Sequence, residues 1–165
     1  MTFGTDPKMV EKVVSAVKKC TKQPLIVKLS PNVTDITEIA KAAEAAGADA
    51  LSLINTLFGM RIDIYRRKPV LAQKMGGFSG PAVKPVAVRM VYQVHKAVRI
   101  PILGMGGVMP AEDVVEFIMA GAAAVATGTA NLVDPAAPVK ILKRLPQVLE
   151  RLGVKDINEI RGIIE

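Results

Sequence analysis

Cysteine, tryptophan and long apolar runs are rare or missing in this sequence. Its 165 residues include one cysteine, Cys20, and no tryptophan. A single thiol cannot form an intrachain disulfide and cannot supply the four thiolates that an iron–sulfur cluster commonly needs. No stretch reaches the roughly 18 consecutive apolar residues of a membrane span, and residues 1–7 lack the basic and apolar blocks of a signal peptide. We therefore expect a cytoplasmic protein with no membrane partner, and any iron–sulfur chemistry must come from another subunit.

Aromatic residues are also few, at 4% of the chain, although the formal net charge is +7. A basic protein can bind nucleic acid, but single-strand binding also needs aromatic rings on which bases stack. The Lys and Arg residues are spread along expected helical faces, so we expect no nucleic-acid partner and a bias toward small anionic ligands. The acidic residues show no spacing typical of metal ligands, and no metal site is expected.

Half of the residues are apolar, and they follow an alternating pattern of strands and helices. Short β-branched or apolar runs indicate four strands, each followed by a segment with helical spacing. An additional helix over about residues 9–20 opens the chain, and no strand precedes it. The expected strands are residues 25–29, 50–54, 101–105 and 123–127, and the expected closing helices are about 136–152 and 158–164.

Successive strand–helix units favour parallel strands with right-handed crossovers, so the predicted fold class is α/β. Four strands would fit a doubly wound sheet, or half of a (β/α) TIM barrel, because a whole barrel needs roughly 250 residues. The opening helix favours the barrel, since a helix with no strand before it resembles the end of a truncated unit. We predict a TIM-barrel fragment of about four βα units with parallel strands, in which residues 1–165 form a single domain, the C-terminal half of a barrel.

A long excursion separates the second strand from the next helix. It runs from Asn55 to Ser79, and alternating apolar residues at 61–65 predict a small hairpin within it. Loops of this length are uncommon in compact domains unless they are functional.

Glycine-rich segments follow the third and fourth expected strands. Residues 104–108 read Gly-Met-Gly-Gly-Val, and residues 127–131 read Thr-Gly-Thr-Ala-Asn. Glycine lets backbone N–H groups approach an anion at a helix N-terminus, and barrel enzymes frequently bind phosphate with the loops after their last two strands. The glycines could instead serve only tight turns between strand and helix. Because two neighbouring units carry such a loop, we predict a phosphate site.

Polar residues at two other strand ends are candidates for the same site. Lys28 ends an apolar strand, where a buried ammonium would need an anionic or polar partner unless it reaches solvent. In a barrel it would point toward the catalytic mouth, where a cation could stabilise a reduced flavin ring. Asn55 and Thr56 directly follow the second strand and are placed to hydrogen-bond a substrate. We interpret Cys20 as a small core residue of its helix and His95 as structural.

An ordered set of motifs resembles the dihydroorotate dehydrogenases over nearly the whole chain. The Ile-Asn-Thr motif followed by Leu57–Met60 is similar to the two-subunit, NAD-linked type in particular. The motifs that carry the resemblance are Val27–Val33, Ile54–Thr56, Gly76–Pro81, Gly104–Val108 and Gly128–Asn131.

The resemblance implies an FMN-dependent (β/α)₈ barrel that oxidises dihydroorotate to orotate in pyrimidine biosynthesis. By motif, Asn55 and Thr56 would bind the substrate. In NAD-linked members, electrons leave through a partner subunit that carries FAD and a [2Fe–2S] cluster. The resemblance assigns Lys28 to the flavin ring, and the residues that would hold the flavin and its phosphate are Ile54, Gly80, Gly106, Gly107, Gly128 and Thr129.

The sequence departs from the family at the catalytic base. In the family this base is a cysteine in a Ser-Cys-Pro-Asn loop just upstream of a Phe-Gly-Thr-Asp-Pro stretch, which here occupies residues 3–7. The base cysteine would therefore lie upstream of Met1, and Cys20, which follows the stretch, cannot inherit its role. We expect the base and the first barrel strands to be missing, no residue of this sequence to be catalytic, and the chain alone to be inactive.

Two alternatives remain open at the level of sequence. The chain could be a non-catalytic half-barrel module that binds or assembles with another copy, or a different phosphate-binding TIM-barrel enzyme. Open sheet edges and an uncovered apolar sheet face also lead us to expect a homo-oligomer.

Overall fold

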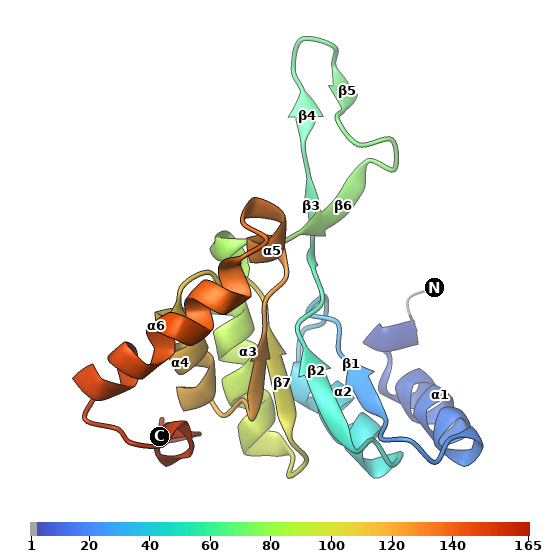
Figure 1. The fold of residues 1–165 in the computed structure, drawn as a ribbon. Coiled ribbons are helices and arrows are strands. Elements are labelled where there is room, and N and C mark those ends of the chain that lie inside the picture. The colour runs from blue at the N-terminus through green and yellow to red at the C-terminus, as the bar shows by residue number, and fades with distance from the viewer. Residues whose placement is uncertain (1–2) are drawn as a thin grey trace.

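The computed structural model describes residues 3–165 as a parallel four-stranded sheet with helices packed on it and an arm at one end (Figure 1). The strand order is β1-β2-β7-β8, so each strand lies beside the previous strand of the sheet. A barrel has this sequential order, whereas a doubly wound sheet reverses its order at a switch point. The predicted parallel half barrel is confirmed, and the doubly wound alternative is wrong. The strands are β1 (Ile26–Lys28), β2 (Ala50–Leu53), β7 (Ile102–Met105) and β8 (Ala124–Ala126).

The first two α-helices begin after aspartates that satisfy some of their free backbone N–H groups. The carboxylate of Asp6 accepts hydrogen bonds from the N–H groups of Lys8 and Met9, at 2.8 and 3.4 Å, and so caps the first helix. Asp35 caps the second helix through the N–H of Thr37. The α-helices are α1 (Pro7–Cys20), α2 (Ile36–Ala45), α3 (Lys84–Ala97), α4 (Ala111–Met119), α5 (Thr129–Val133) and α6 (Ala137–Arg151), and the 3₁₀ turns are η1 (Phe3–Thr5), η2 (Pro81–Val83) and η3 (Ile157–Ile160).

The helices form one layer, in which α1, α2, α3, α4 and α6 contact one another in that order. Within residues 3–165, no helix combines the length and the apolar character that a membrane crossing requires. Helix α1 lies at the edge of the layer and buries only Val10 and Val14. For this reason the prediction that Cys20 is a core residue is wrong: its side chain ends α1 and is exposed.

The two faces of the sheet differ in how far they are covered. Leu51, Leu53 and Ile102 point toward the helices and are at most 2% exposed, because side chains alternate along a strand. The other face carries Ile26, which is 52% exposed, and the exposed Ala124. Closed barrels turn this face inward. We call it the inner face, and it is open in this chain.

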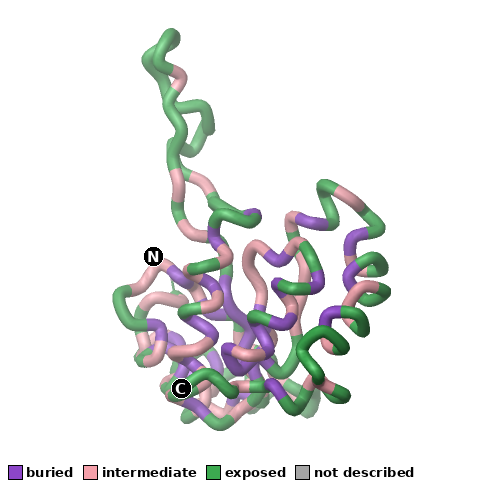
Figure 2. Tube along the Cα trace, turned by 90° about the vertical axis from the view of Figure 1, so that its left-hand side faces the viewer, coloured by how far each residue is buried: buried purple, intermediate pink, exposed green. Residues whose placement is uncertain are grey.

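A two-part ribbon leaves the sheet after β2 and returns before α3 (Figure 1). We call residues 57–78 the arm, and no residue between 55 and 79 is buried (Figure 2). The hairpin predicted around residues 61–65 forms its tip, and a second antiparallel pair extends it toward the sheet. The pairs are β3 (Leu57–Met60) with β6 (Met75–Phe78), and β4 (Ile62–Asp63) with β5 (Lys68–Pro69).

Candidate cofactor-binding site

The segments that follow β2, β7 and β8 meet at the carboxyl ends of the strands. They enclose a cavity of about 160 Å³, which we call the cradle cavity. Lys28 at the end of β1 and Ser79, just after the arm, complete its wall. The other lining residues are Ile54, Asn55, Thr56, Met105, Gly106, Gly107, Ala126, Thr127, Gly128 and Thr129.

The two loops of the cavity need glycine for different reasons. Gly106 and Gly107 have φ angles of +130° and +79°, which other residues rarely adopt. A Cβ atom at Gly107 would lie 2.7 Å from the carbonyl oxygen of Gly80 and 2.9 Å from the nitrogen of Lys84. Around Gly128, by contrast, a Cβ atom would meet nothing within 4 Å. Tight packing explains the first two glycines, but it does not explain the third.

A hydrogen bond joins the loop after β8 to the residue that directly follows the arm. The hydroxyl of Thr129 donates to the hydroxyl oxygen of Ser79 at 3.1 Å. Within the loop, the Thr127 hydroxyl donates to Oδ1 of Asn131 at 3.0 Å, and Nδ2 of Asn131 donates to the Thr127 carbonyl at 3.2 Å. The entrance to helix α5 is therefore fixed relative to the arm.

Lys28 is the charged residue of the cradle cavity. Its ammonium lies 2.6 Å from the sulfur of Met105, and burial lowers its pKa below the ordinary lysine value. The sequence predicted that Lys28 needs an anionic or polar partner unless it reaches solvent; the residue is exposed, and the group that its ammonium contacts is this thioether. None of the described residues that line the cavity is acidic. The charge of Lys28 is thus directed to a cavity that offers no competing carboxylate.

A second cavity of about 250 Å³ shares Lys28, Asn55 and Thr56 with the cradle cavity. Its remaining wall includes Ser30 and Asn32 from the loop after β1. Nδ2 of Asn32 donates to the Thr56 carbonyl, and Oδ1 of Asn32 accepts from the N–H of Phe58, both at 3.0 Å. Asn32 thereby holds the base of the arm beside the three shared residues.

The structure brings together most of the residues that the sequence singled out. Eight of the nine predicted site residues line the cradle cavity, and the ninth, Gly80, lies directly behind Gly107. Ile54 follows a cis peptide bond. Sequence reasoning assigned no role to Ser79, Met105 or Asn32, although Asn32 belongs to a Ser-Pro-Asn segment that directly follows a strand and could have been a signal.

The position of the catalytic base is not tested by the structure. The sequence predicts a base cysteine upstream of Met1, and Met1 itself lies outside residues 3–165, which the structure describes. Within the described part of the chain, Cys20 ends α1 before β1 begins, and it lines neither cavity. A base supplied from upstream of Met1 therefore stays a prediction.

His95 does not line the cradle cavity, and neither does any acidic side chain of the described residues. The His95 ring packs against Gly121 and Gly162, in agreement with a structural role. Among residues 3–165, no cluster of three or more His, Cys, Asp or Glu side chains is arranged to hold a metal ion.

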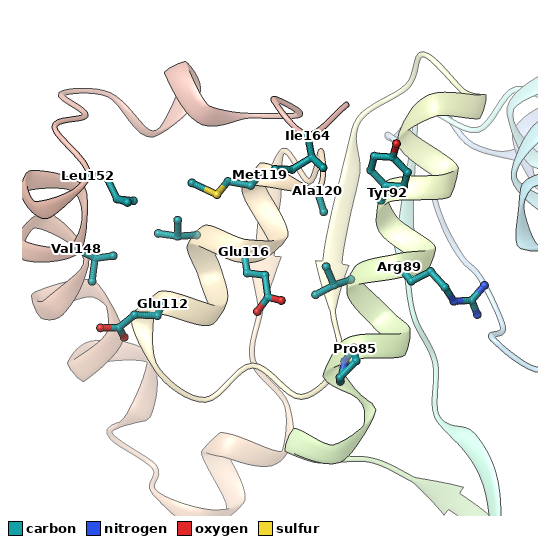
Figure 3. Close-up of a pocket in the computed structure, with 12 residues that line it drawn as sticks. Pro85, Arg89, Tyr92, Glu112, Glu116, Met119, Ala120, Val148, Leu152 and Ile164 are labelled. Atoms are coloured by element: carbon teal, nitrogen blue, oxygen red, sulfur yellow. The ribbon is translucent and has the colours of Figure 1, made fainter.

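A larger cavity of about 680 Å³ lies in the helical layer (Figure 3). Its walls come from α3, α4, the end of α6 and the C-terminal segment, with Tyr92, Met119 and Leu152 among them. Barrel active sites lie at the carboxyl ends of the strands, and this cavity does not. The cradle cavity, although smaller, is therefore the candidate site.

Parallel strands in barrel order define a segment of a (β/α) barrel, and a glycine-lined cavity lies at the carboxyl ends of these strands. The sequence profile of the family described as dihydroorotate dehydrogenase matches residues 1–149. The chain belongs to the dihydroorotate dehydrogenase family.

Curated relatives agree with this assignment, and a solved structure agrees with the fold. "Dihydroorotate dehydrogenase B (NAD(+)), catalytic subunit" of Alkaliphilus metalliredigens is 64% identical over 97% of the chain and 53% of that protein. The protein of the same name from Lachnoclostridium phytofermentans is 58% identical over 100% of the chain and 55% of its own length. The chain thus spans about half the length of the curated relatives it matches. A crystal structure of the Eimeria tenella enzyme with ferulenol matches 96% of this chain and 48% of that enzyme's chain. The TM-score is 0.79 at 22% sequence identity, which supports the fold.

Proposed function

We propose that the cradle cavity binds the phosphate group of FMN. The observation that carries the proposal is the convergence of two glycine loops on one cavity that has no acidic wall. The open space beside Gly128 leaves room for a ligand. Glycine loops at helix entrances favour a phosphate monoester.

We place the flavin ring near Lys28 and the substrate in the second cavity. Lys28, Asn55 and Thr56 line both cavities, so they lie where a ring and a substrate would meet. The Lys28 ammonium would stabilise negative charge on the ring, and the Asn55 amide and Thr56 hydroxyl would orient the substrate. FMN, when bound, would supply the acceptor for a hydride. The cradle cavity, at about 160 Å³, is smaller than a typical whole-ligand pocket, which supports a role for the phosphate end only.

We propose that the protein takes part in the oxidation of dihydroorotate to orotate in pyrimidine biosynthesis. Family membership and the names of the relatives support this reaction. The oxidation removes a proton as well as a hydride, so it needs a base. Cys20, which is exposed at the end of α1 and lines neither cavity, is not placed to act as that base. We therefore propose that residues 1–165 alone hold the flavin without turning over the substrate.

The proposed partner is an electron-transfer subunit that carries FAD and a [2Fe–2S] cluster. The relatives are named as catalytic subunits of an NAD(+)-linked enzyme, and this name supports a separate subunit that delivers electrons to NAD(+). A cytoplasmic location is part of the same proposal.

We also propose that the chain forms a homo-oligomer through the arm. Apolar side chains along the arm point into solvent, and Tyr65 at its tip is 91% exposed. Apolar surface of this extent commonly marks a contact between proteins. The exposed apolar residues of the arm include Phe58, Met60, Ile62, Ile64, Val70, Leu71, Met75 and Phe78.

A titration with two flavins tests the phosphate site. FMN and riboflavin share the ring and differ in the phosphate, and binding of each can be followed by flavin fluorescence. We expect FMN to bind at least about tenfold more tightly, which corresponds to about 1.4 kcal/mol. Equal affinities for FMN and riboflavin would contradict a phosphate site in the cradle cavity.

A further inference from the structure

We propose that Lys84 and Asp113 are positioning residues, which hold the loop of residues 106–109 in the conformation that receives the phosphate. Neither residue lines the cradle cavity, so neither would touch the ligand. This inference rests on the proposed FMN site and adds to it two residues that lie behind the loop.

Asp113 anchors the far end of the loop. It lies in the first turn of α4 and is only 7% exposed. Its Oδ1 accepts a hydrogen bond from Nζ of Lys84 at 2.7 Å, and its Oδ2 accepts one from the N–H of Met109 at 2.8 Å. Met109 belongs to the segment that joins β7 to α4. Both oxygens of a buried carboxylate are therefore used, and one of them fixes the loop backbone.

Lys84 connects this anchor to the glycines. It is the first residue of α3, and its Nζ also donates to Oε2 of Glu116 at 2.6 Å. Hydrogen bonds to Asp113 and Glu116 raise the pKa of Lys84, so its ammonium stays charged. Its backbone lies directly behind Gly107, where an added Cβ would be 2.9 Å from both the nitrogen and the Cβ of Lys84.

The loop needs such a restraint because its glycines are intrinsically free. Glycine adopts positive and negative φ values with similar ease, and two consecutive glycines give the loop many conformations. The path from Gly107 through Lys84 and Asp113 to the N–H of Met109 closes around both ends of the loop. A loop held before the ligand arrives loses less entropy on binding, and this raises affinity for the group that it contacts.

The competing explanation is that the ion pair between Lys84 and Asp113 only joins α3 to α4. The chain offers a control in which the same kinds of bond are made by a more exposed carboxylate. The Asp49 carboxylate accepts hydrogen bonds from Nζ of Lys18 at 2.5 Å and from the N–H of Leu25 at 2.7 Å. This lysine–carboxylate–backbone arrangement lies near the amino ends of β1 and β2. Replacing Asp49 breaks the same kinds of bond away from the cradle cavity.

The experiment measures the affinity of the chain for FMN and riboflavin in Lys84→Met, Asp113→Asn, Asp49→Asn and the unchanged protein, with thermal denaturation as a check of folding. We expect Lys84→Met and Asp113→Asn to raise the Kd for FMN about tenfold and that for riboflavin less than about twofold. Asp49→Asn should leave the ratio of the two Kd values unchanged. Lys84→Arg should restore most of the preference for FMN, because a guanidinium can bridge both carboxylates.

Each outcome supports or overturns the positioning role of Lys84 and Asp113. If folded Lys84→Met and Asp113→Asn bind FMN and riboflavin with equally raised Kd values, or with an unchanged ratio of the two Kd values, the positioning role is overturned. The proposed phosphate site would still stand. If the unchanged protein itself shows no preference for FMN, the phosphate site fails and the inference fails with it. If Asp113→Asn does not fold, Lys84→Met decides alone, because Lys84 is partly exposed and its loss leaves the bond between Asp113 and Met109 in place.

Discussion

At the scale of single residues, the glycines of the cavity differ in what their neighbours permit. Gly107 has a φ of +79° and no room for a Cβ atom. We expect Gly107→Ala to lower the free energy of unfolding by about 2–4 kcal/mol, because a strained backbone and an overpacked contact each cost about 1–2 kcal/mol or more. Urea denaturation measures this loss, and a change below about 1 kcal/mol would contradict the packing described.

Gly128 provides the opposite case. A Cβ atom there meets nothing within 4 Å, so Gly128→Ala should change the free energy of unfolding by less than about 1 kcal/mol. If the open space receives the phosphate, the same substitution should raise the Kd for FMN at least about tenfold and leave the Kd for riboflavin nearly unchanged. Paired titrations check this, and unchanged FMN affinity in the folded variant would count against phosphate beside Gly128.

His95 predicts how stability depends on pH. Burial is the main cause that lowers its pKa below 6.5, and the charges of Lys96 and Arg161 add to the shift. The unfolded chain therefore takes up a proton at a higher pH than the folded chain. The contribution of neutral His95 to the free energy of unfolding is fully present above about pH 6.5. It is lost as the pH falls from there through the lowered pKa of the folded state. We expect urea denaturation to show less acid destabilisation between pH 7 and 5 in His95→Gln, and equal pH dependence would contradict this.

At the scale of elements, strand and helix positions could be predicted because the core is built from sequence-local periodicity. Leu51 and Leu53 alternate along β2, and Val10 and Val14 repeat along α1 as a helix requires. Helix α5, from Thr129 to Val133, was missed because five residues carry no readable period. The exposure of Cys20 was missed because it depends on the place of α1 at the edge of the layer.

The site likewise contains residues that the sequence could indicate and residues that it could not. Lys28 ends β1, and Asn55 and the loop glycines lie within two residues of the end of a strand. Parallel strands bring such positions to one edge of the sheet. Asn32 and Asp113 act through partners that are distant in the sequence, such as Phe58 and Lys84. Nothing in residue type or spacing indicates these pairs, because they depend on how α3, α4 and the arm pack.

The arm can be tested as an element because it is outside the core. We expect a chain in which a short Gly-Ser linker replaces residues 57–78 to keep its melting temperature within about 4 °C, since no residue of the arm is buried. If the arm forms the contact between copies, sedimentation should show a smaller assembly than that of the unchanged chain. An identical assembly in both chains would place the contact elsewhere.

At the scale of the whole molecule, the open inner face predicts complementation. The chain spans about half of the Alkaliphilus metalliredigens relative, which is 64% identical to it over the shared region. We expect co-expression with the half of that relative outside the match to yield a soluble complex that dihydroorotate bleaches when FMN is bound. The chain alone, mixed with FMN and dihydroorotate, should show no bleaching. Robust turnover by the chain alone would refute the proposal that it holds the flavin without oxidising the substrate.

The helical layer also determines which complement can close the sheet. Five helices, α1, α2, α3, α4 and α6, lie side by side over four strands, with α1 and α6 at the two ends. A closed (β/α)₈ barrel has one helix for each strand, so two copies of this chain would bring ten helices to eight strands. At each seam, α6 of one copy and α1 of the other would compete for a single place. The half barrel is therefore not a twofold repeat unit: its closing partner must bring four strands and only three helices, and the helix count selects against self-closure.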